Sequence, residues 1–227
     1  VALDPKTGAI LAMVSQPTFD PNDLAGHDLS ALDENYEKLN TDPQRPLVNR
    51  SINGDLYPPG SIFKVITAAA ALSSGEYTED SMLPGPAVLE LPGTTASLPN
   101  MFPGACGAND KVSFTRAMAI SCNTAFAAVG MDIGADALRA QAEKFGFGDS
   151  LSVPMRVTPS TVPAELNMPQ LAQSSIGQFD VRVTPLQMAM VAAGVANDGT
   201  VMKPYLVQSV IGSDLSVIET TDEQELS

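Results

Sequence analysis

The stretch Tyr57-Pro58-Pro59-Gly60-Ser61-Ile62-Phe63-Lys64 joins a turn signal directly to the start of an apolar segment. Consecutive prolines followed by glycine interrupt regular structure. From Ile62 to Leu72 the only charge is on Lys64. A helix without a polar face is typical of a protein core, and Gly75 stands where helices commonly end. We therefore predict a buried helix over 62–72 that begins beside Ser61.

Ser61 and Lys64 are three residues apart, so on a helix they share one face. A serine hydroxyl is a weak nucleophile until an adjacent base activates it. A lysine is a base only when neutral, and its ordinary pKa of about 10.4 must then fall by about 3. Desolvation at a buried helix start can lower the pKa in this way. The pair is equally consistent with a capping serine and a lysine whose stem lies along apolar surface.

A second candidate group is Ser121-Cys122-Asn123, at the end of another apolar stretch. Its hydroxyl and amide could relay a proton and orient a substrate amide. Capping of a helix end is the alternative interpretation of Ser121. The other Ser-x-Asn string, Ser51-Ile52-Asn53, fits better as a loop before the Pro-Pro-Gly turn.

Composition excludes several classes of function. The 227 residues suit one large domain or two small lobes around a shared core. The formal charge of −14 opposes binding to nucleic acid or to anionic lipid. One histidine and two cysteines cannot form the usual zinc site. His27 lies in a polar stretch and is expected to be a solvated loop residue. No window has the roughly 18 apolar residues of a membrane span.

The remaining pattern predicts a mixture of strands and helices. Val1–Leu3 and Ala9–Val14 flank the turn residues Asp4–Gly8, which indicates a β-hairpin. The segment 15–22 should leave this hairpin in extended form. Further predictions are a short helix near 33–39, helices over 111–128, 135–145 and 184–196, a turn at 197–200, a strand over 201–211, and a polar, acidic tail. Thr184-Pro185 has the composition of a helix start.

Taken in order, these strings resemble the transpeptidase domain of penicillin-binding proteins. The Ser-x-x-Lys and Ser-x-Asn boxes belong to the motif set of that group. The likeness runs over about residues 1–210, and parts of it resemble the monofunctional, class B group in particular. Further strings in family order are 3–13, Pro17-Thr18-Phe19-Asp20-Pro21-Asn22, Asn49-Arg50, Ser175-Ile176-Gly177-Gln178, Thr184-Pro185-Leu186-Gln187 and Ala196-Asn197-Asp198-Gly199.

The resemblance implies a mixed α/β penicilloyl-serine transferase fold, with an antiparallel sheet flanked by helices and an all-helical lobe. Residues 1–227 would be a partial transpeptidase domain, with 1–22 as opening strands and 57–200 as the mostly helical part that carries the active site. The third box of the family, Lys-Thr-Gly, occurs only as Lys6-Thr7-Gly8 in the first turn, where we expect no catalytic role. We expect the native protein to extend on both sides and to supply the missing C-terminal strands. The sheet here should show an open edge and a bare face, and the chain alone should be nearly inactive.

The activity implied by the resemblance is peptidoglycan D,D-transpeptidation. Ser61 would attack the penultimate carbonyl of a stem peptide ending in D-Ala-D-Ala, and Lys64 would take its proton. Ser121 would pass a proton to the leaving amine, and Asn123 would hold the peptide amide. An amine of a neighbouring stem would then form the cross-link, and β-lactams would acylate Ser61. No cofactor or metal is implied. Stem peptides, glycan-polymerising proteins and division proteins are the expected partners, at the extracytoplasmic face of the bacterial membrane.

Two other functions fit the same nucleophile: a serine β-lactamase and a non-enzymatic penicillin-binding sensor domain. A class A β-lactamase needs a glutamate three residues before Leu-Asn, but Pro163 stands there before Leu166-Asn167, and Glu165 is out of register. A purely structural domain is the third alternative. Cys106 and Cys122 either form a disulfide, as extracytoplasmic proteins permit, or are a loop thiol and a small buried residue.

Overall fold

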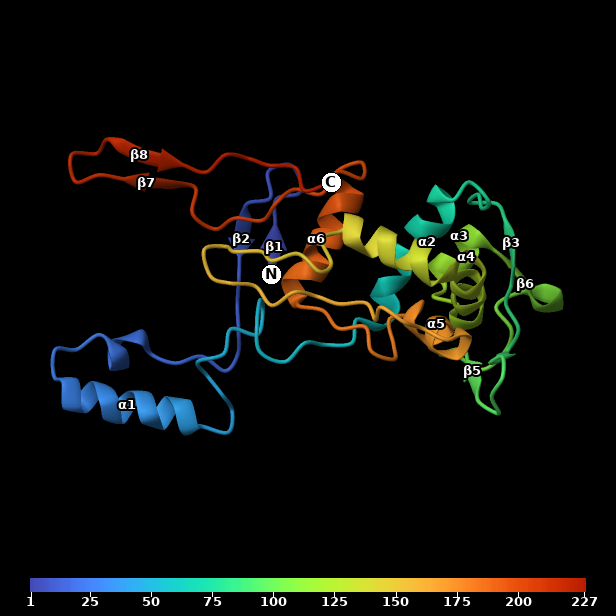
Figure 1. The fold of residues 1–227 in the computed structure, drawn as a ribbon, viewed down its shortest axis with the longest axis horizontal. Helices are drawn as coiled ribbons and strands as arrows, with labels where there is room; N and C mark the ends of the chain where they lie inside the picture. The colour runs from blue at the N-terminus through green and yellow to red at the C-terminus, as the bar shows by residue number, and fades with distance from the viewer.

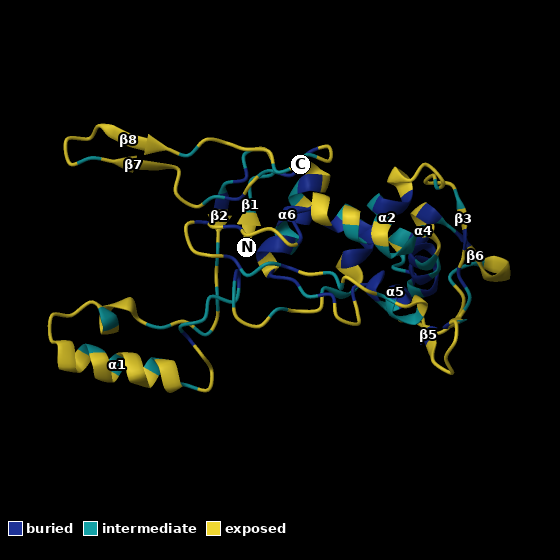
Figure 2. Ribbon diagram, viewed as in Figure 1, coloured by how far each residue is buried: buried dark blue, intermediate teal, exposed yellow.

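Two hydrophobic clusters organise the chain, and two helices contribute to both of them. The computed structural model describes residues 1–227, drawn in Figure 1. One cluster has 18 buried residues and the other has 14. Helix α2 (Lys64–Ser73) gives Ile66 to the first and Ala71 to the second, and α4 (Asn123–Lys144) gives Leu138 and Phe126 in the same way. The packed pair α2 and α4 is therefore the centre of the fold, as the buried residues in Figure 2 show.

The strands form four separate two-stranded antiparallel ribbons, which pair β1 with β2, β3 with β6, β4 with β5 and β7 with β8. Their bounds are β1 Ala2–Leu3, β2 Ile10–Ala12, β3 Met82–Pro84, β4 Val88–Glu90, β5 Ser97–Pro99, β6 Lys111–Ser113, β7 Ser209–Ile211 and β8 Val217–Thr220. The hairpin expected at the N-terminus is confirmed, with Leu3 opposite Ile10. Leu11 on its outer side is 68% exposed, so this ribbon has an uncovered face as expected.

The remaining helices are short apart from α1 and α6. Their bounds are η1 Pro21–Leu24, α1 Leu29–Thr41, η2 Gly60–Phe63, η3 Ala108–Asp110, α3 Phe114–Ala119, α5 Met168–Ser174 and α6 Pro185–Ala196. Helix α6 confirms the predicted start, because the side chain of Thr184 accepts a hydrogen bond from the backbone N–H of Gln187. Helix α1 is longer than expected because Asp28 caps it and extends it by a full turn at its N-terminal end.

The prediction of one helix over 111–128 was wrong in two respects, whereas the helix predicted over 135–145 is present as the part of α4 that follows Gly134. Residues 111–113 are strand β6, not helix, because Val112 is buried against β3 and its neighbours are not. The predicted helix over 111–128 is also broken: α3 ends at Ala119, and Ser121 adopts a positive φ of 56° before α4 begins. Within α4, Gly134 has a φ of 84°, which kinks the helix.

The strand predicted over 201–211 is mostly absent. Pro204 has no N–H to donate to a ladder, and only single bridges form around it, from Met202 to Glu225 and from Tyr205 to Ala9. The regular strand β7 begins at Ser209. The β7–β8 ribbon and α1 extend away from the packed helices as two arms on the left of Figure 1. None of the helices is long and apolar enough to cross a membrane.

The prediction that α2 is buried on all sides was wrong for one side. Lys64, Ile66 and Thr67 are buried, but Ile62 is 53% exposed in the preceding η2 turn. The exposed side faces α6 across a hollow of about 320 Å³, lined only by apolar side chains. These side chains are Ile62, Val65, Met188, Val191, Ala192 and Val195.

Candidate active site

Ser61 lies in the η2 turn, immediately before α2, and the turn is held by the chain that follows α5. The backbone N–H of Gly60 donates to the carbonyl of Gly177 at 2.9 Å. Gly177 has a φ of 72°, and a Cβ atom there would lie 2.1 Å from the carbonyl oxygen of Gly60. Only glycine therefore allows this close approach.

The predicted loop at 51–53 lies before the Pro-Pro-Gly turn, as expected, and packs in the core, where Ile52 is fully buried.

The Ser121-Cys122-Asn123 string forms the corner between α3 and α4. Ser121 has a φ of 56°, a region that non-glycine residues seldom adopt and that clusters at functional sites. Cys122 caps α4, where its Sγ accepts from the N–H of Ala125 at 3.4 Å. The backbone of Ser121 closes the end of α3, because its N–H donates to the carbonyl of Met118 at 3.1 Å and the N–H of Cys122 donates to the carbonyl of Ala117 at 2.8 Å. The helix-end interpretation of Ser121 therefore holds for its backbone, whereas its hydroxyl caps neither helix and is available for other contacts.

The corner meets the first turn of α2 at the amine of Lys64, so the four predicted site residues lie together. Lys64 Nζ is 3.2 Å from Ser61 Oγ, 2.9 Å from Ser121 Oγ, 2.7 Å from the Ser121 carbonyl oxygen and 2.6 Å from Asn123 Oδ1. The amine also lies 5.9 Å from the ring centroid of Phe126. The lysine is 1% exposed, so its stem does not lie along open surface as the alternative interpretation required.

Burial gives this amine the character of a base. Desolvation lowers the pKa of Lys64 from 10.5 to about 8, because the charged form loses water. An ammonium group has three N–H donors, and these four oxygen atoms can accept them. A neutral amine has two N–H donors for Asn123 Oδ1 and the Ser121 carbonyl, and a lone pair that accepts from a serine hydroxyl. The surroundings therefore satisfy Lys64 in both protonation states.

Asn100, which sequence reasoning missed, holds the corner from behind. Its Oδ1 accepts from the backbone N–H groups of Asn123 at 3.0 Å and Thr124 at 3.1 Å. Its Nδ2 donates to the carbonyl of Pro86 at 2.9 Å. A single Asn before an irregular loop carries no sequence signal for this role, because the contact joins segments 23 and 24 residues apart.

A disulfide between Cys106 and Cys122 fastens the same corner to the loop after β5. No cysteine remains free. Of the two possibilities that the sequence left open, the disulfide is the one the structure contains. Cys122 is 2% exposed, so the bridge lies inside the second hydrophobic cluster.

An open cleft of about 490 Å³ lies in front of Ser61 and Asn123. Leu91, Leu98 and Ile176 form its apolar part, and the amides of Gln173 and Gln178 add hydrogen-bonding groups. The Gln178 side chain makes no hydrogen bond within the chain, and Gln173 donates only one weak bond, at 3.4 Å to Pro169. Gln178 belongs to the string Ser175–Gln178, which resembles the family. The sequence alone could not place its side chain in the cleft, because that position depends on the close contact between Gly177 and Gly60.

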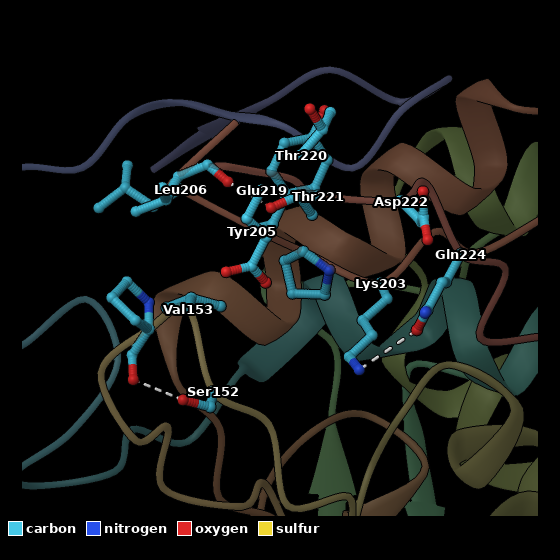
Figure 3. Close-up of a pocket in the computed structure, with 13 residues that line it drawn as sticks. Ser152, Val153, Lys203, Tyr205, Leu206, Glu219, Thr220, Thr221, Asp222 and Gln224 are labelled. Carbon is cyan, nitrogen blue, oxygen red and sulfur yellow. Dashed lines mark hydrogen bonds between the residues drawn. The ribbon is translucent and has the colours of Figure 1, made fainter. Parts of the chain in front are cut away.

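A second groove, of about 350 Å³, lies between residues 152–154 and the segments around β7 and β8 (Figure 3). Lys203 Nζ donates to Gln224 Oε1 at 3.3 Å, and Ser152 donates to the carbonyl of Pro154. None of the four predicted site residues lines this groove.

Residues that we excluded from the site lie elsewhere. Lys6-Thr7-Gly8 is a turn, as predicted, and its exposed Lys6 pairs with Asp198 at 3.9 Å. His27 is exposed in an irregular loop, also as predicted. Asn167 caps α5 and Glu165 is exposed, so the Leu166-Asn167 pair serves a helix start.

Comparison with known proteins identifies the family and the fold of this chain. The family described as the penicillin-binding protein transpeptidase domain matches residues 1–227. The chain is 49% identical over 226 residues to the peptidoglycan D,D-transpeptidase PbpA of Mycolicibacterium smegmatis, a match that covers 99% of this chain and 46% of that protein. The chain thus spans about half the length of the curated relatives it matches.

Solved structures give the same result. A ceftriaxone acyl-enzyme complex of penicillin-binding protein A from M. tuberculosis matches with a TM-score of 0.93 and 45% identity, over 99% of this chain and 50% of that one. A chain of a peptidoglycan synthase complex, solved for its coordination of polymerization and crosslinking, matches with a TM-score of 0.82 and 26% identity, over 99% of this chain and 38% of that one. The predicted mixed α/β fold is confirmed by these matches.

Proposed function

Because this chain belongs to the transpeptidase-domain family of penicillin-binding proteins, we propose that it carries the nucleophilic half of a peptidoglycan D,D-transpeptidase. The observation that carries the proposal is the buried amine of Lys64, which lies within hydrogen-bonding distance of both Ser61 Oγ and Ser121 Oγ. In the domain, residues 1–22 supply opening strands and residues 57–200 supply the part that holds the site.

The first step is acylation of Ser61. Neutral Lys64 takes the hydroxyl proton as Ser61 Oγ attacks the penultimate carbonyl carbon of a stem peptide ending in D-Ala-D-Ala. The tetrahedral intermediate collapses, the C–N bond breaks, and the leaving amine takes a proton from Ser121, which Lys64 replenishes. The burial that lowers the pKa of Lys64 makes it a base near neutral pH.

Asn123 and the cleft hold the peptide during this step. The Asn123 Oδ1 atom is engaged by Lys64, and its Nδ2 donates to the carbonyl of Pro99 at 3.1 Å. These two bonds fix the Asn123 amide in the cleft that Ser61 also lines, and the second hydrogen of Nδ2 is left to donate to the carbonyl of a substrate amide. Two hydrogen-bond donors for the oxyanion are also needed, of which the N–H of Ser61 is one. The Lys-Thr-Gly strand that supplies the rest in the family is not in these 227 residues.

The second step transfers the acyl group to an amine of a neighbouring stem and forms the cross-link. β-Lactams use the first step only and leave Ser61 acylated, in line with the acyl-enzyme complexes of the M. tuberculosis relative. The place of action is then the extracytoplasmic face of the bacterial cell membrane, where peptidoglycan is assembled. A glycan-polymerising protein is the proposed partner, as the similarity to a chain of a peptidoglycan synthase complex supports. The partners further include proteins of cell division or cell shape.

Intact mass spectrometry of the full-length protein after incubation with penicillin G tests the proposal. One adduct of the mass of penicillin is expected, and peptide mapping should place it on Ser61. Ser61→Ala should remove the adduct, whereas Ser213→Ala, at an exposed serine far along the chain, should keep it. Absence of any adduct in the wild-type protein would favour a purely structural domain. Rapid loss of the adduct by hydrolysis would favour a β-lactamase instead. Acylation without turnover of a D-Ala-D-Ala peptide would favour a sensor domain.

A further inference from the structure

Two hollows lie beside the corner at Ser121, and three of the four proposed catalytic residues line one or the other. The larger cleft is lined by Ser61 and Asn123. A smaller hollow of about 110 Å³ is lined by Ile120, Ser121 and the loop from Asn100 to Cys106. Met101 lines both. A reaction with two substrates at one serine needs two approaches, and two neighbouring hollows lie at this corner.

The loop of the smaller hollow is anchored at both ends to the catalytic corner. Asn100 accepts hydrogen bonds from Asn123 and Thr124, and Cys106 is bonded to Cys122. Asn100 Nδ2 also donates to the carbonyl of Gly104 at 3.1 Å, which braces the loop across its width. These contacts hold the loop from Asn100 to Cys106 in a fixed position beside Ser121, and we call this loop the rim.

This rim nevertheless presents its two large apolar side chains to solvent. Met101 is 76% exposed and Phe102 is 77% exposed. Single exposed apolar residues are common, but these two are adjacent, on an anchored loop, and beside a proposed proton donor. Such a surface is suited to pack against the apolar part of a ligand.

The chemistry identifies which ligand approaches from this side. In the proposed first step Ser121 gives a proton to the leaving amine, so that amine departs past Ser121. The acceptor amine enters where the leaving amine left, because aminolysis of the acyl-enzyme is the acylation step in reverse with a different amine. The approach beside Ser121 is therefore the approach of the acceptor, and the larger cleft is left for the donor peptide.

We propose that the hollow formed by the Asn100–Cys106 loop is the acceptor subsite, and that Met101 and Phe102 pack against the methylene stem of an aliphatic primary amine. The inference rests on the proposed function. A volume of about 110 Å³ has room for such a stem but not for a whole stem peptide. The amine nitrogen of the acceptor then reaches the acyl carbon beside Ser121.

The step balances without a further reactant. The neutral acceptor amine forms a C–N bond with the acyl carbon of the Ser61 ester, and the C–Oγ bond breaks. One amine proton passes by way of the Ser121 hydroxyl and the Lys64 amine to Ser61 Oγ. The products are the amide cross-link and free Ser61, with Ser121 and Lys64 returned to their starting states.

The partition of the acyl-enzyme between aminolysis and hydrolysis tests this inference in the full-length protein. The donor is diacetyl-L-Lys-D-Ala-D-Ala. The acceptors are Nα-acetyl-lysine, whose free amine stands at the end of a chain of methylene groups, and glycine, whose amine stands on a single methylene group next to the carboxylate. Mass spectrometry gives the ratio of aminolysis to hydrolysis products. Acylation by a fluorescent penicillin is measured in parallel, because it involves the donor side only.

In Phe102→Ala, the ratio with Nα-acetyl-lysine should fall about fivefold, as expected for loss of one aromatic packing contact. The ratio with glycine and the acylation rate should change less than twofold. Phe102→Tyr should retain the wild-type ratio. Leu29→Ala is the matched control, because Leu29 is 75% exposed, similar to Phe102, but lies on the distant helix α1. This variant should change neither the ratio with either acceptor nor the acylation rate.

An unchanged ratio in Phe102→Ala, or an equal fall in the ratio and in acylation, would overturn the acceptor subsite and leave the proposed function intact. A wild-type protein that is acylated but forms only hydrolysis product would overturn it as well. A wild-type protein that is not acylated at all would instead overturn the proposed function, on which the subsite depends.

Discussion

The amine of Lys64 lies 2.6 Å from Oδ1 of Asn123, across 59 residues of sequence. One residue is the first of α2 and the other is the first of α4, so the packing of these two helices sets the distance. The arrangement of the proposed catalytic residues is therefore fixed by the centre of the fold. The following four expectations use the full-length protein.

Lys64→Arg should lower acylation by penicillin by about 10³-fold or more, because a guanidinium stays protonated and cannot accept the Ser61 proton. Arginine retains the positive charge of protonated lysine, so a loss of acylation would be assigned to the missing basicity at position 64. Stopped-flow measurement with a fluorescent penicillin gives the rate. Lys38→Arg, on the exposed α1, is the matched control. Acylation by Lys64→Arg within tenfold of wild type would exclude Lys64 as the base.

Acylation should depend on pH through Lys64. The pKa of Lys64 is lowered to about 8. The neutral, reactive form therefore predominates above pH 8, and its fraction falls as the pH drops below that value. The rate should therefore rise about tenfold per pH unit up to pH 7 and level off above pH 8 to 9. The rate is to be measured at constant ionic strength between pH 5.5 and 9.5. A rate independent of pH below 8 would contradict this assignment.

Gly177→Ala should impair acylation by moving the nucleophile. The added Cβ would lie 2.1 Å from the Gly60 carbonyl oxygen, next to Ser61, at a φ of 72°. A displacement near 1 Å at a reacting group can cost about 10²-fold in rate. Gly93→Ala is a matched control, because Gly93 also has a φ of 72° but a Cβ added there would meet no atom within 4 Å. Equal rates in both variants would show that Gly177 does not position Ser61.

Loss of the disulfide should destabilise the domain. Cys106 and Cys122 are 16 residues apart, and closing a loop of this length stabilises a protein by about 3 kcal/mol in the chain-entropy treatment. The double variant Cys106→Ser, Cys122→Ser should unfold at a lower temperature than the oxidised wild type, by scanning calorimetry. Reducing agent should lower the Tm of the wild type but not of the variant. An unchanged Tm in both experiments would show that the bridge contributes nothing to stability.

Much of the local structure follows from the amino-acid order. Ser61 and Lys64 are three residues apart at a helix start, so any helix there brings them together. Thr184 and Pro185 define the start of α6 by hydrogen bonding and by a fixed φ, both of which are local effects. The hairpin of β1 and β2 follows from turn residues in the same way.

The boundaries of 111–128 were predicted incorrectly for a physical reason. Short apolar runs that are interrupted by polar residues, as in this segment, fit a strand, one helix or two helices about equally well. The pairing of β6 with β3 and the positive φ of Ser121 depend on neighbours distant in sequence. Propensity therefore could not place the break at Ser121, on which the geometry of the site depends.

The sequence by itself determined the proposed nucleophile and base, the capped start of α6 and the family, because these depend on short spacings and on ordered motifs. Only the tertiary structure decided that Ser121 and Asn123 meet Lys64, that Asn100 and the disulfide hold their corner, and that Met101 and Phe102 form an exposed rim beside it. These relationships join segments that are far apart in the chain. They exist because α2 and α4 share two hydrophobic clusters, and the burial in those clusters also lowers the pKa of Lys64.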